Sequence, residues 1–69
     1  MIEKEFKKWL TDCVNRNLYE MSDLEDALLY EDLAFSMFEN FQYESSTFLK
    51  DQVHDLVKDV LDKVKTEND

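Results

Sequence analysis

The chain has 69 residues and contains neither glycine nor proline. These two residue types normally supply positive-φ turns, helix stops and strand breaks. Without them, the connections between elements fall to residues such as asparagine and serine, and helices joined by such turns are the expected result. Hydrophobic residues make up 43% of the sequence at regular spacing, which favours a folded chain over disorder. The sequence therefore predicts a single all-α domain over residues 1–69.

The N-terminal segment predicts a first amphipathic helix over about residues 2–16. Its apolar residues recur at steps of three and four, at Ile2, Phe6, Trp9, Leu10 and Cys13. At about 100° per residue these positions form one stripe along a helix. Asn15 and Asn17 are expected to end this helix, because asparagine tolerates the left-handed conformation where glycine is absent.

The central segment predicts a second helix over about residues 23–41. Ser22 and Glu25 have the spacing of a capping box, in which each side chain accepts from the other residue's backbone amide. The side chains expected on the buried face are Ala27, Tyr30, Ala34, Met37, Phe38 and Phe41.

The same segment also allows a second interpretation. Leu24, Leu28 and Phe35 extend the buried face to one side, whereas Leu29 and Leu33 lie on its other side, so the phase of the apolar pattern changes along the segment. A break near residues 30–32, with Asp32 capping a second short helix, would explain that change. The alternatives are one continuous helix and two shorter ones.

The C-terminal segment predicts a third helix over about residues 47–65. Residues 42–47 resemble a loop, and the helix that follows has three candidate caps, Ser45, Ser46 and Thr47. The residues that share its apolar face are Leu49, Val53, Leu56, Val57, Val60 and Val64. Together the segments predict a small three-helix bundle.

Charge is divided unevenly along the chain, whose formal net charge is −9. Between Arg16 and Lys50 lie 33 residues with no basic side chain and eight acidic ones. Like charges repel and weaken the compact state, so such a segment requires an explanation. The functional explanation that we favour is a partner with a positively charged surface.

The candidate partner-binding residues are the acids of this central segment: Glu20, Asp23, Glu25, Asp26, Glu31, Asp32, Glu39 and Glu44. On a continuous helix, acids seven residues apart at 25, 32 and 39 would stand about 10 Å from one another over about 21 Å. A rigid carboxylate array can imitate DNA phosphates and occupy a basic groove. The competing interpretation is a solvated surface that only keeps the protein soluble.

Apolar side chains of the same segment predict a different site. If Leu29, Leu33, Phe35 or Tyr43 is exposed, it contributes to an apolar patch rimmed by acids, which is a typical protein-docking surface. Burial of the aromatic residues in the core is the plainer alternative. In that case Leu29 and Leu33 could meet a second copy of the chain in a homodimer.

Several function classes are disfavoured by what the chain contains. One cysteine and one histidine do not make a metal site, and we expect no cofactor. Cys13 belongs to the apolar stripe of the first helix, and His54 is expected to be a surface residue. The sequence contains no catalytic set and no phosphate-binding loop, so we do not expect an enzyme. The lone thiol fits a cytoplasmic location. No long apolar run predicts a membrane span, and the negative charge disfavours direct binding of nucleic acid.

In size and composition the whole chain resembles the small acidic helical proteins that phages and mobile elements use against restriction or CRISPR enzymes, some of which mimic DNA. That resemblance implies an inhibitor or modulator of a basic, nucleic-acid-handling protein. We therefore predict a non-enzymatic interaction protein that acts through its carboxylate face. The alternative is a structural or adaptor module that self-associates, or docks one partner, through the apolar face of the central segment.

Overall fold

The computed structural model describes residues 2–41 and 50–67, which form four α-helices. These are α1 (Ile2–Asn15), α2 (Met21–Leu29), α3 (Glu31–Phe41) and α4 (Lys50–Glu67). The expected all-α fold is confirmed. The central segment forms two helices rather than one, which confirms the second interpretation, a break near residues 30–32, and makes the number of helices among the described residues four where three were expected.

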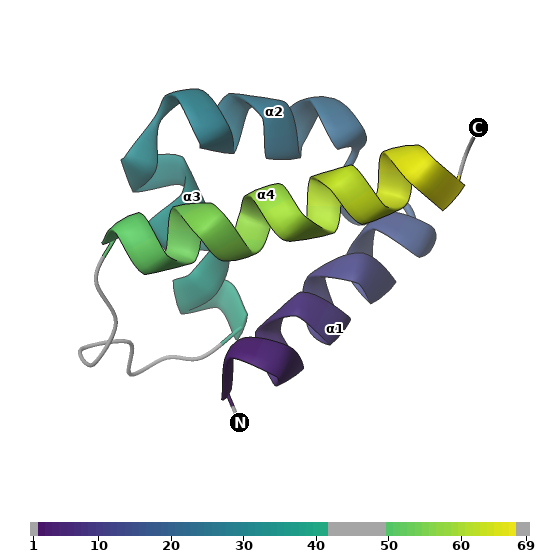
Figure 1. The fold of residues 1–69 in the computed structure, drawn as a ribbon, viewed down its shortest axis with the longest axis horizontal. Coiled ribbons are helices and arrows are strands. Elements are labelled where there is room, and N and C mark those ends of the chain that lie inside the picture. The colour runs from purple at the N-terminus through teal and green to yellow at the C-terminus, as the bar shows by residue number, and fades with distance from the viewer. Residues whose placement is uncertain (1, 42–49, 68–69) are drawn as a thin grey trace.

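The longest helix, α4, is the element around which the others are arranged. Figure 1 shows α4 crossing in front of α3, with α2 along one side of it and α1 along the other. Each of α1, α2 and α3 contacts α4, and α2 also contacts α3. The apolar face of α4 consists of Val53, Leu56, Val57, Val60, Leu61 and Val64, all buried. These residues give α4 one broad apolar face, against which α1, α2 and α3 pack from different directions.

The rest of the core comes from one stripe on each surrounding helix. Its fully buried side chains are Phe6, Leu10, Leu24, Ala27, Ala34 and Phe38. The rings of Phe6 and Phe38 lie 5.0 Å apart between centroids and join α1 to α3. Phe41 adds to this contact at 5.7 Å from Phe6 and 5.5 Å from Trp9. Tilted ring pairs at these distances add to the free energy gained by burial alone.

Asn17 ends the first helix, as expected from the sequence. Its φ of 62° places it in the left-handed region, which asparagine tolerates better than most residues. The Leu18 amide donates to the Cys13 carbonyl at 2.8 Å, and the Asn17 amide donates to the Val14 carbonyl at 3.1 Å. This pair of bonds is the Schellman motif. The motif turns the chain sharply into α2.

The cap of α2 differs from the predicted one. Glu20, not Ser22, occupies the N-cap position, and the Glu20 amide donates to the Asp23 carboxylate at 2.9 Å. The capping box therefore joins Glu20 to Asp23, two residues before the expected Ser22 and Glu25 pair. Ser22 instead donates from its hydroxyl to the Glu20 carboxylate at 3.5 Å.

The break between α2 and α3 falls on the single residue Tyr30. Its backbone is extended, with φ −128° and ψ 106°. The Tyr30 amide closes α2 by donating to the Asp26 carbonyl, while its own carbonyl accepts from Leu33 and so begins α3. Tyr30 is thus the N-cap of α3, and the expectation that Asp32 would cap it is wrong.

Glu31 supplies the physical reason for the break. On an uninterrupted helix, Glu31 would lie four residues after Ala27 and three before Ala34, in the middle of the buried stripe. Burying a carboxylate there would carry a large desolvation penalty. The break leaves Glu31 exposed. It also turns Tyr30 outward, 62% exposed, so the expectation that Tyr30 would be buried is wrong.

Some expectations lie outside the described residues. These are the loop at 42–47, the candidate caps Ser45, Ser46 and Thr47, the start of the last helix at 47, and the candidate site residues Tyr43 and Glu44.

Replacing Phe38 by alanine should abolish the fold. Truncating a fully buried phenylalanine costs about 3–5 kcal/mol, which is as much as a core of this size supplies (about 3–5 kcal/mol). The matched control is Tyr30→Ala, which removes a mostly exposed ring and should change the free energy of unfolding by less than about 0.5 kcal/mol. Urea titrations followed by circular dichroism measure both. Equal losses in the two variants would contradict the placement of these rings.

Candidate protein-interaction surface

The acids of the central segment are all exposed wherever the structure describes them. They lie in the turn before α2 (Glu20), on α2 (Asp23, Glu25, Asp26) and on α3 (Glu31, Asp32, Glu39). Leaving Asp32 aside, none forms an ion pair with a lysine or arginine among the described side chains. Their negative charge is therefore directed at solvent or at a partner.

These acids do not form the straight line that a continuous helix would give. Glu25 belongs to α2, whereas Asp32 and Glu39 belong to α3, which turns away from α2 at Tyr30 (Figure 1). The predicted regular spacing over a single helix face is thus wrong. The physical reason is the break itself, which changes the direction of the helix axis between the first acid and the second.

Four large apolar side chains are exposed on the described part of the chain. The exposed fractions are 64% for Leu18, 74% for Leu29, 62% for Tyr30 and 46% for Leu33. The interpretation of the apolar side chains as a protein-docking surface required Leu29 or Leu33 to be exposed, and both are. Phe35, a further candidate, is partly buried against the core instead. Leu18 was not among the candidates, because its exposure depends on the Schellman turn that the sequence places only roughly.

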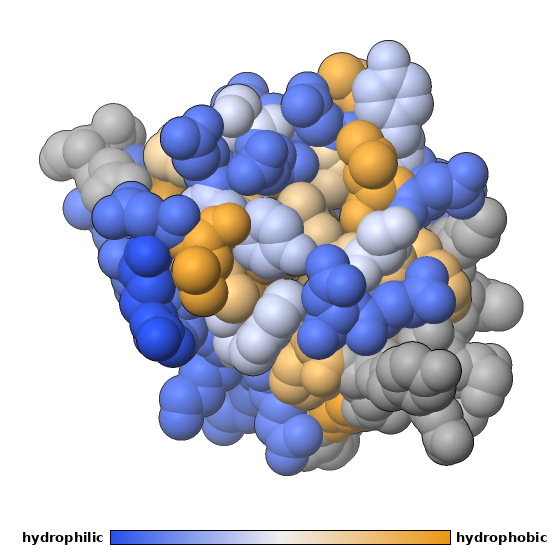
Figure 2. Space-filling model, turned by 180° about the vertical axis from the view of Figure 1, so that it is seen from behind, coloured by the Kyte–Doolittle hydropathy of each residue, from blue (hydrophilic) through white to orange (hydrophobic). Residues whose placement is uncertain are grey.

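Two of these leucines border a groove between α2, α3 and the turn before α2. The groove has a volume of about 340 Å³. We call it the α2–α3 groove, and its lining residues are Leu18, Tyr19, Asp23, Asp26, Leu33, Ser36, Met37 and Asn40. Figure 2, which views the molecule from the side away from α4, shows apolar patches separated by hydrophilic side chains. The surface of the protein thus mixes the two chemistries that the sequence suggested separately.

Side-chain contacts fix the walls of the groove. Asn40 on α3 donates from Nδ2 to the Tyr19 hydroxyl at 3.0 Å, which ties α3 to the turn before α2. The Tyr19 ring in turn meets Trp9 edge to face at 6.2 Å between centroids. Met37 is only 6% exposed and closes the floor. A groove held by these contacts exists before any partner arrives, which lowers the entropy lost on binding.

The α2 side of this surface carries two acids followed by a leucine. Asp23, Asp26 and Leu29 follow one another at steps of three, so they lie along one side of α2. Asp23 is oriented by the bond from the Glu20 amide. The result is a leucine-bearing ridge with two carboxylates along it.

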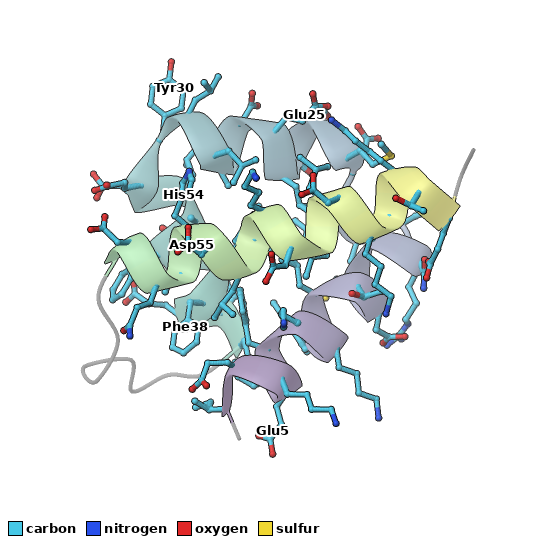
Figure 3. All side chains as sticks on the ribbon, viewed as in Figure 1. Glu5, Glu25, Tyr30, Phe38, His54 and Asp55 are labelled. Carbon is cyan, nitrogen blue, oxygen red and sulfur yellow. The ribbon has the colours of Figure 1, made fainter. Side chains whose placement is uncertain are left out.

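His54 positions the end of this ridge. Its Nε2 atom lies 3.1 Å from the Leu28 carbonyl oxygen, and since a carbonyl only accepts, Nε2 is the donor. Nδ1 lies 3.7 Å from the Asp55 carboxylate. Figure 3 shows His54 between α4 and the end of α2 that leads to Tyr30. The expectation of a plain surface histidine is thus wrong, because the side chain is 33% exposed and bonds across two helices.

Cys13 lies in the core. Burial raises the pKa of its thiol, the Asp12 carboxylate raises it further, and Arg16 opposes both. A raised pKa keeps the sulfur in its thiol form, whereas nucleophilic cysteines need the thiolate. Cys13 therefore packs as a small apolar side chain.

Within residues 2–41 and 50–67, no three side chains of the histidine, cysteine, aspartate and glutamate types converge as metal ligands would. No described helix combines the length and the apolar character needed to cross a membrane.

Comparisons with protein-family models, with curated proteins and with solved structures yield no significant match to this chain.

Replacing His54 by alanine should lower the free energy of unfolding by about 1 kcal/mol, the usual net contribution of one hydrogen bond. Because the bond ends at the last turn of α2, amide exchange at Leu29 and Tyr30 should accelerate more than exchange elsewhere. His54→Gln, whose side-chain amide can still donate, serves as the control and should recover part of the loss. Exchange that accelerates uniformly along the chain would argue against a local role.

Proposed function

We propose that this protein is a non-enzymatic interaction protein that docks a basic partner protein through the α2–α3 groove and the acids around it. The observation that supports this most is the combination at one place of exposed leucines with the carboxylates of Asp23 and Asp26, which form no ion pair with a described lysine or arginine. Binding requires no chemistry, and occupancy of the partner's basic surface would inhibit or modulate it. A nucleic-acid-handling protein fits the partner's chemistry, since such proteins present basic surfaces.

The apolar part of the surface supplies the energy in this proposal. Leu33 at the groove edge and Leu29 at the end of α2 are large side chains that gain free energy when a partner covers them. Interfaces derive most of their affinity from a few such anchors near the centre of the contact. The groove also offers a floor at Met37 that a partner's side chain can reach.

The acids supply attraction and selectivity. Asp23 and Asp26 line the groove, and Glu20 and Glu25 lie beside them. Complementary charge accelerates association and excludes acidic partners, while it adds less to affinity than the apolar anchors do. A partner segment that carries lysine or arginine beside an apolar residue matches this surface.

This proposal modifies the DNA-mimic idea. Mimicry by a regular line of carboxylates relied on an unbroken helix, and Tyr30 interrupts it. What remains in its favour is the number of exposed acids on α2 and α3, since Asp23, Glu25, Asp26, Glu31 and Glu39 form no ion pair with a described lysine or arginine. We therefore propose contact with a basic protein through a mixed surface, in the reducing environment of the cytoplasm, where a lone thiol such as Cys13 is commonly found.

Self-association through the same surface is the second candidate function. The 74% exposure of Leu29 favours it, because a symmetric dimer would bury this side chain. Charge opposes it, since a two-fold axis through the patch would bring Asp26 and Glu31 of one copy near those of the other. Screening such repulsion requires high salt.

The partner-binding proposal predicts separable effects of charge and apolar variants. The partner is captured on the immobilised chain, identified by mass spectrometry, purified and measured by biolayer interferometry. Asp23→Asn with Asp26→Asn should weaken binding about five- to tenfold, mostly through slower association. Leu33→Ser should weaken it more than tenfold through faster dissociation. Asparagine at 23 can still accept the Glu20 amide, so the cap of α2 persists.

Matched controls exist elsewhere on the chain. Asp51→Asn with Glu67→Gln removes two exposed acids of α4 and changes the net charge equally. This control should bind like the unmodified chain. A partner whose binding responds equally to both acid pairs would show that only overall charge matters, and that result would overturn the proposed site.

Symmetric self-association makes a prediction about the effect of salt. A dimer through Leu29 and Leu33 should become stronger as salt rises from about 0.15 M to about 1 M, because screening removes the acid repulsion while apolar burial persists. Sedimentation equilibrium measures this. A monomer throughout that range would exclude the second candidate.

A further inference from the structure

A second groove, far less acidic, lies between α1 and α4. Its volume is about 470 Å³, and its lining residues are Lys4, Lys7, Lys8, Thr11, Asp59, Val60 and Lys63. We call it the lysine groove. With four lysines and one aspartate its formal charge is +3, in a chain whose net charge is −9. The basic residues near both chain ends are thus brought together by the packing of α1 on α4.

Most of this positive charge is available to a ligand. Lys7 lies 3.6 Å from the Asp59 carboxylate across the helix contact. Lys4, Lys8 and Lys63 form no ion pair with a described residue. The methylene stems of these lysines give the groove an apolar wall beneath the ammonium groups, and the buried Val60 lies at its base.

The lining does not suit a small phosphate. The Thr11 hydroxyl already donates to the Lys7 carbonyl at 2.7 Å, and the described residues that line the groove include no arginine for a bidentate contact. A phosphate backbone would also leave the apolar wall without a counterpart. An occupant that brings apolar side chains beside carboxylates fits better.

The chain carries such a ligand on its own surface. At the α2–α3 corner, which we define as Asp26, Leu29, Tyr30 and Glu31, two large exposed apolar side chains stand between two exposed acids. In Figure 3, Tyr30 projects from this corner at one end of the view, and Glu5 of α1 lies at the opposite end.

We propose that the lysine groove receives the α2–α3 corner of a second copy of this chain. Leu29 and Tyr30 lie against the apolar wall, while Asp26 and Glu31 pair with lysines at the rim. The contact joins two different surfaces, so each copy keeps a free corner and a free groove. Association of this kind is head to tail and continues beyond a dimer, into a ring or an open chain. This self-association goes beyond the binding of a foreign partner proposed above. A foreign partner on the α2–α3 corner would compete with the lysine groove of a second copy.

Charge gives this association a distinctive dependence on salt. At 0.15 M salt the Debye length is about 8 Å, so ion pairs at the contact, which act over about 4 Å, are only partly screened. The centres of two molecules, each with a radius of gyration of 11.0 Å, are farther apart than this length, so the repulsion between their net charges is largely screened. Net repulsion between copies therefore dominates at about 0.01 M, where the Debye length is about 30 Å. At about 1 M the contact pairs are screened too. Association should peak between these limits.

Sedimentation equilibrium at protein concentrations of about 0.1 to 1 mM tests the proposal, since so small a contact is weak. The average mass of the unmodified chain should rise with concentration beyond that of a dimer, and most at intermediate salt. Lys4→Glu with Lys8→Glu should lower the association constant more than tenfold. The control variant, Lys58→Glu with Lys65→Glu, reverses the same amount of charge outside the groove. It should associate much more strongly than the variant with both groove lysines replaced.

Mixing two variants separates this arrangement from a symmetric one. The groove variant keeps its corner, and a corner variant, Leu29→Ser with Tyr30→Ser, keeps its groove. Neither should associate alone, and an equimolar mixture should form dimers and nothing larger. All these positions are exposed, and circular dichroism verifies that the variants fold. A monomeric unmodified chain at every salt concentration would overturn the proposal, as would a mixture that stays monomeric or control lysines that matter equally.

Discussion

Burial of the apolar face of α4 is the interaction on which the rest of this structure depends. Three helices approach that face from different directions, and each contributes one narrow stripe to a core with few large residues. A single straight helix over residues 23–41 could cover α4 along only one line. The break at Tyr30 lets α2 lie along α4 while α3 crosses it (Figure 1). Covering α4 therefore determines the path of the central segment.

The same break shapes the surface. Where the helix ends, Glu31 stays in water and Tyr30 turns outward, and Leu29 and Leu33 on either side of the break are exposed with it. The acids that a continuous helix would have aligned are divided between two axes. A carboxylate line is thereby replaced by a surface that combines leucines with acids. Both proposals above use that surface, one with a foreign basic protein and one with the lysine groove of a second copy.

The sequence predicted local features better than relations between helices. The stripe from Phe6 to Cys13, the stop at Asn17 and the valine face of α4 depend on short-range periodicity and turn chemistry, and all three are present. The predicted N-cap of α2 was wrong because serine is a preferred N-cap in general. In the structure Glu20 and Asp23 form the capping box instead, each side chain accepting from the other residue's backbone amide.

Features that need two helices at once were not predictable. His54 looked like a surface residue because its own helix places it off the apolar face, and only the approach of α2 gives it the Leu28 carbonyl as a partner. Leu18 is exposed because of the direction in which the Schellman turn at Asn17 leads the chain from α1 to α2. The choice between one helix and two rested on Glu31, whose desolvation penalty matters only once the segment packs against α4. The segregation of lysines into one groove likewise follows from packing α1 against α4.

The central claim is that residues 21–41 form two helices that meet at Tyr30. Backbone chemical shifts and amide-to-amide nuclear Overhauser effects along this segment measure it directly. The account predicts helical chemical shifts on both sides of Tyr30, and at Tyr30 itself the chemical shift of an extended residue and a large amide–Hα coupling. It also predicts no nuclear Overhauser effect between the Hα of residue 27 and the amide of residue 31. Uninterrupted helical shifts and contacts from residue 21 to residue 41 would contradict it.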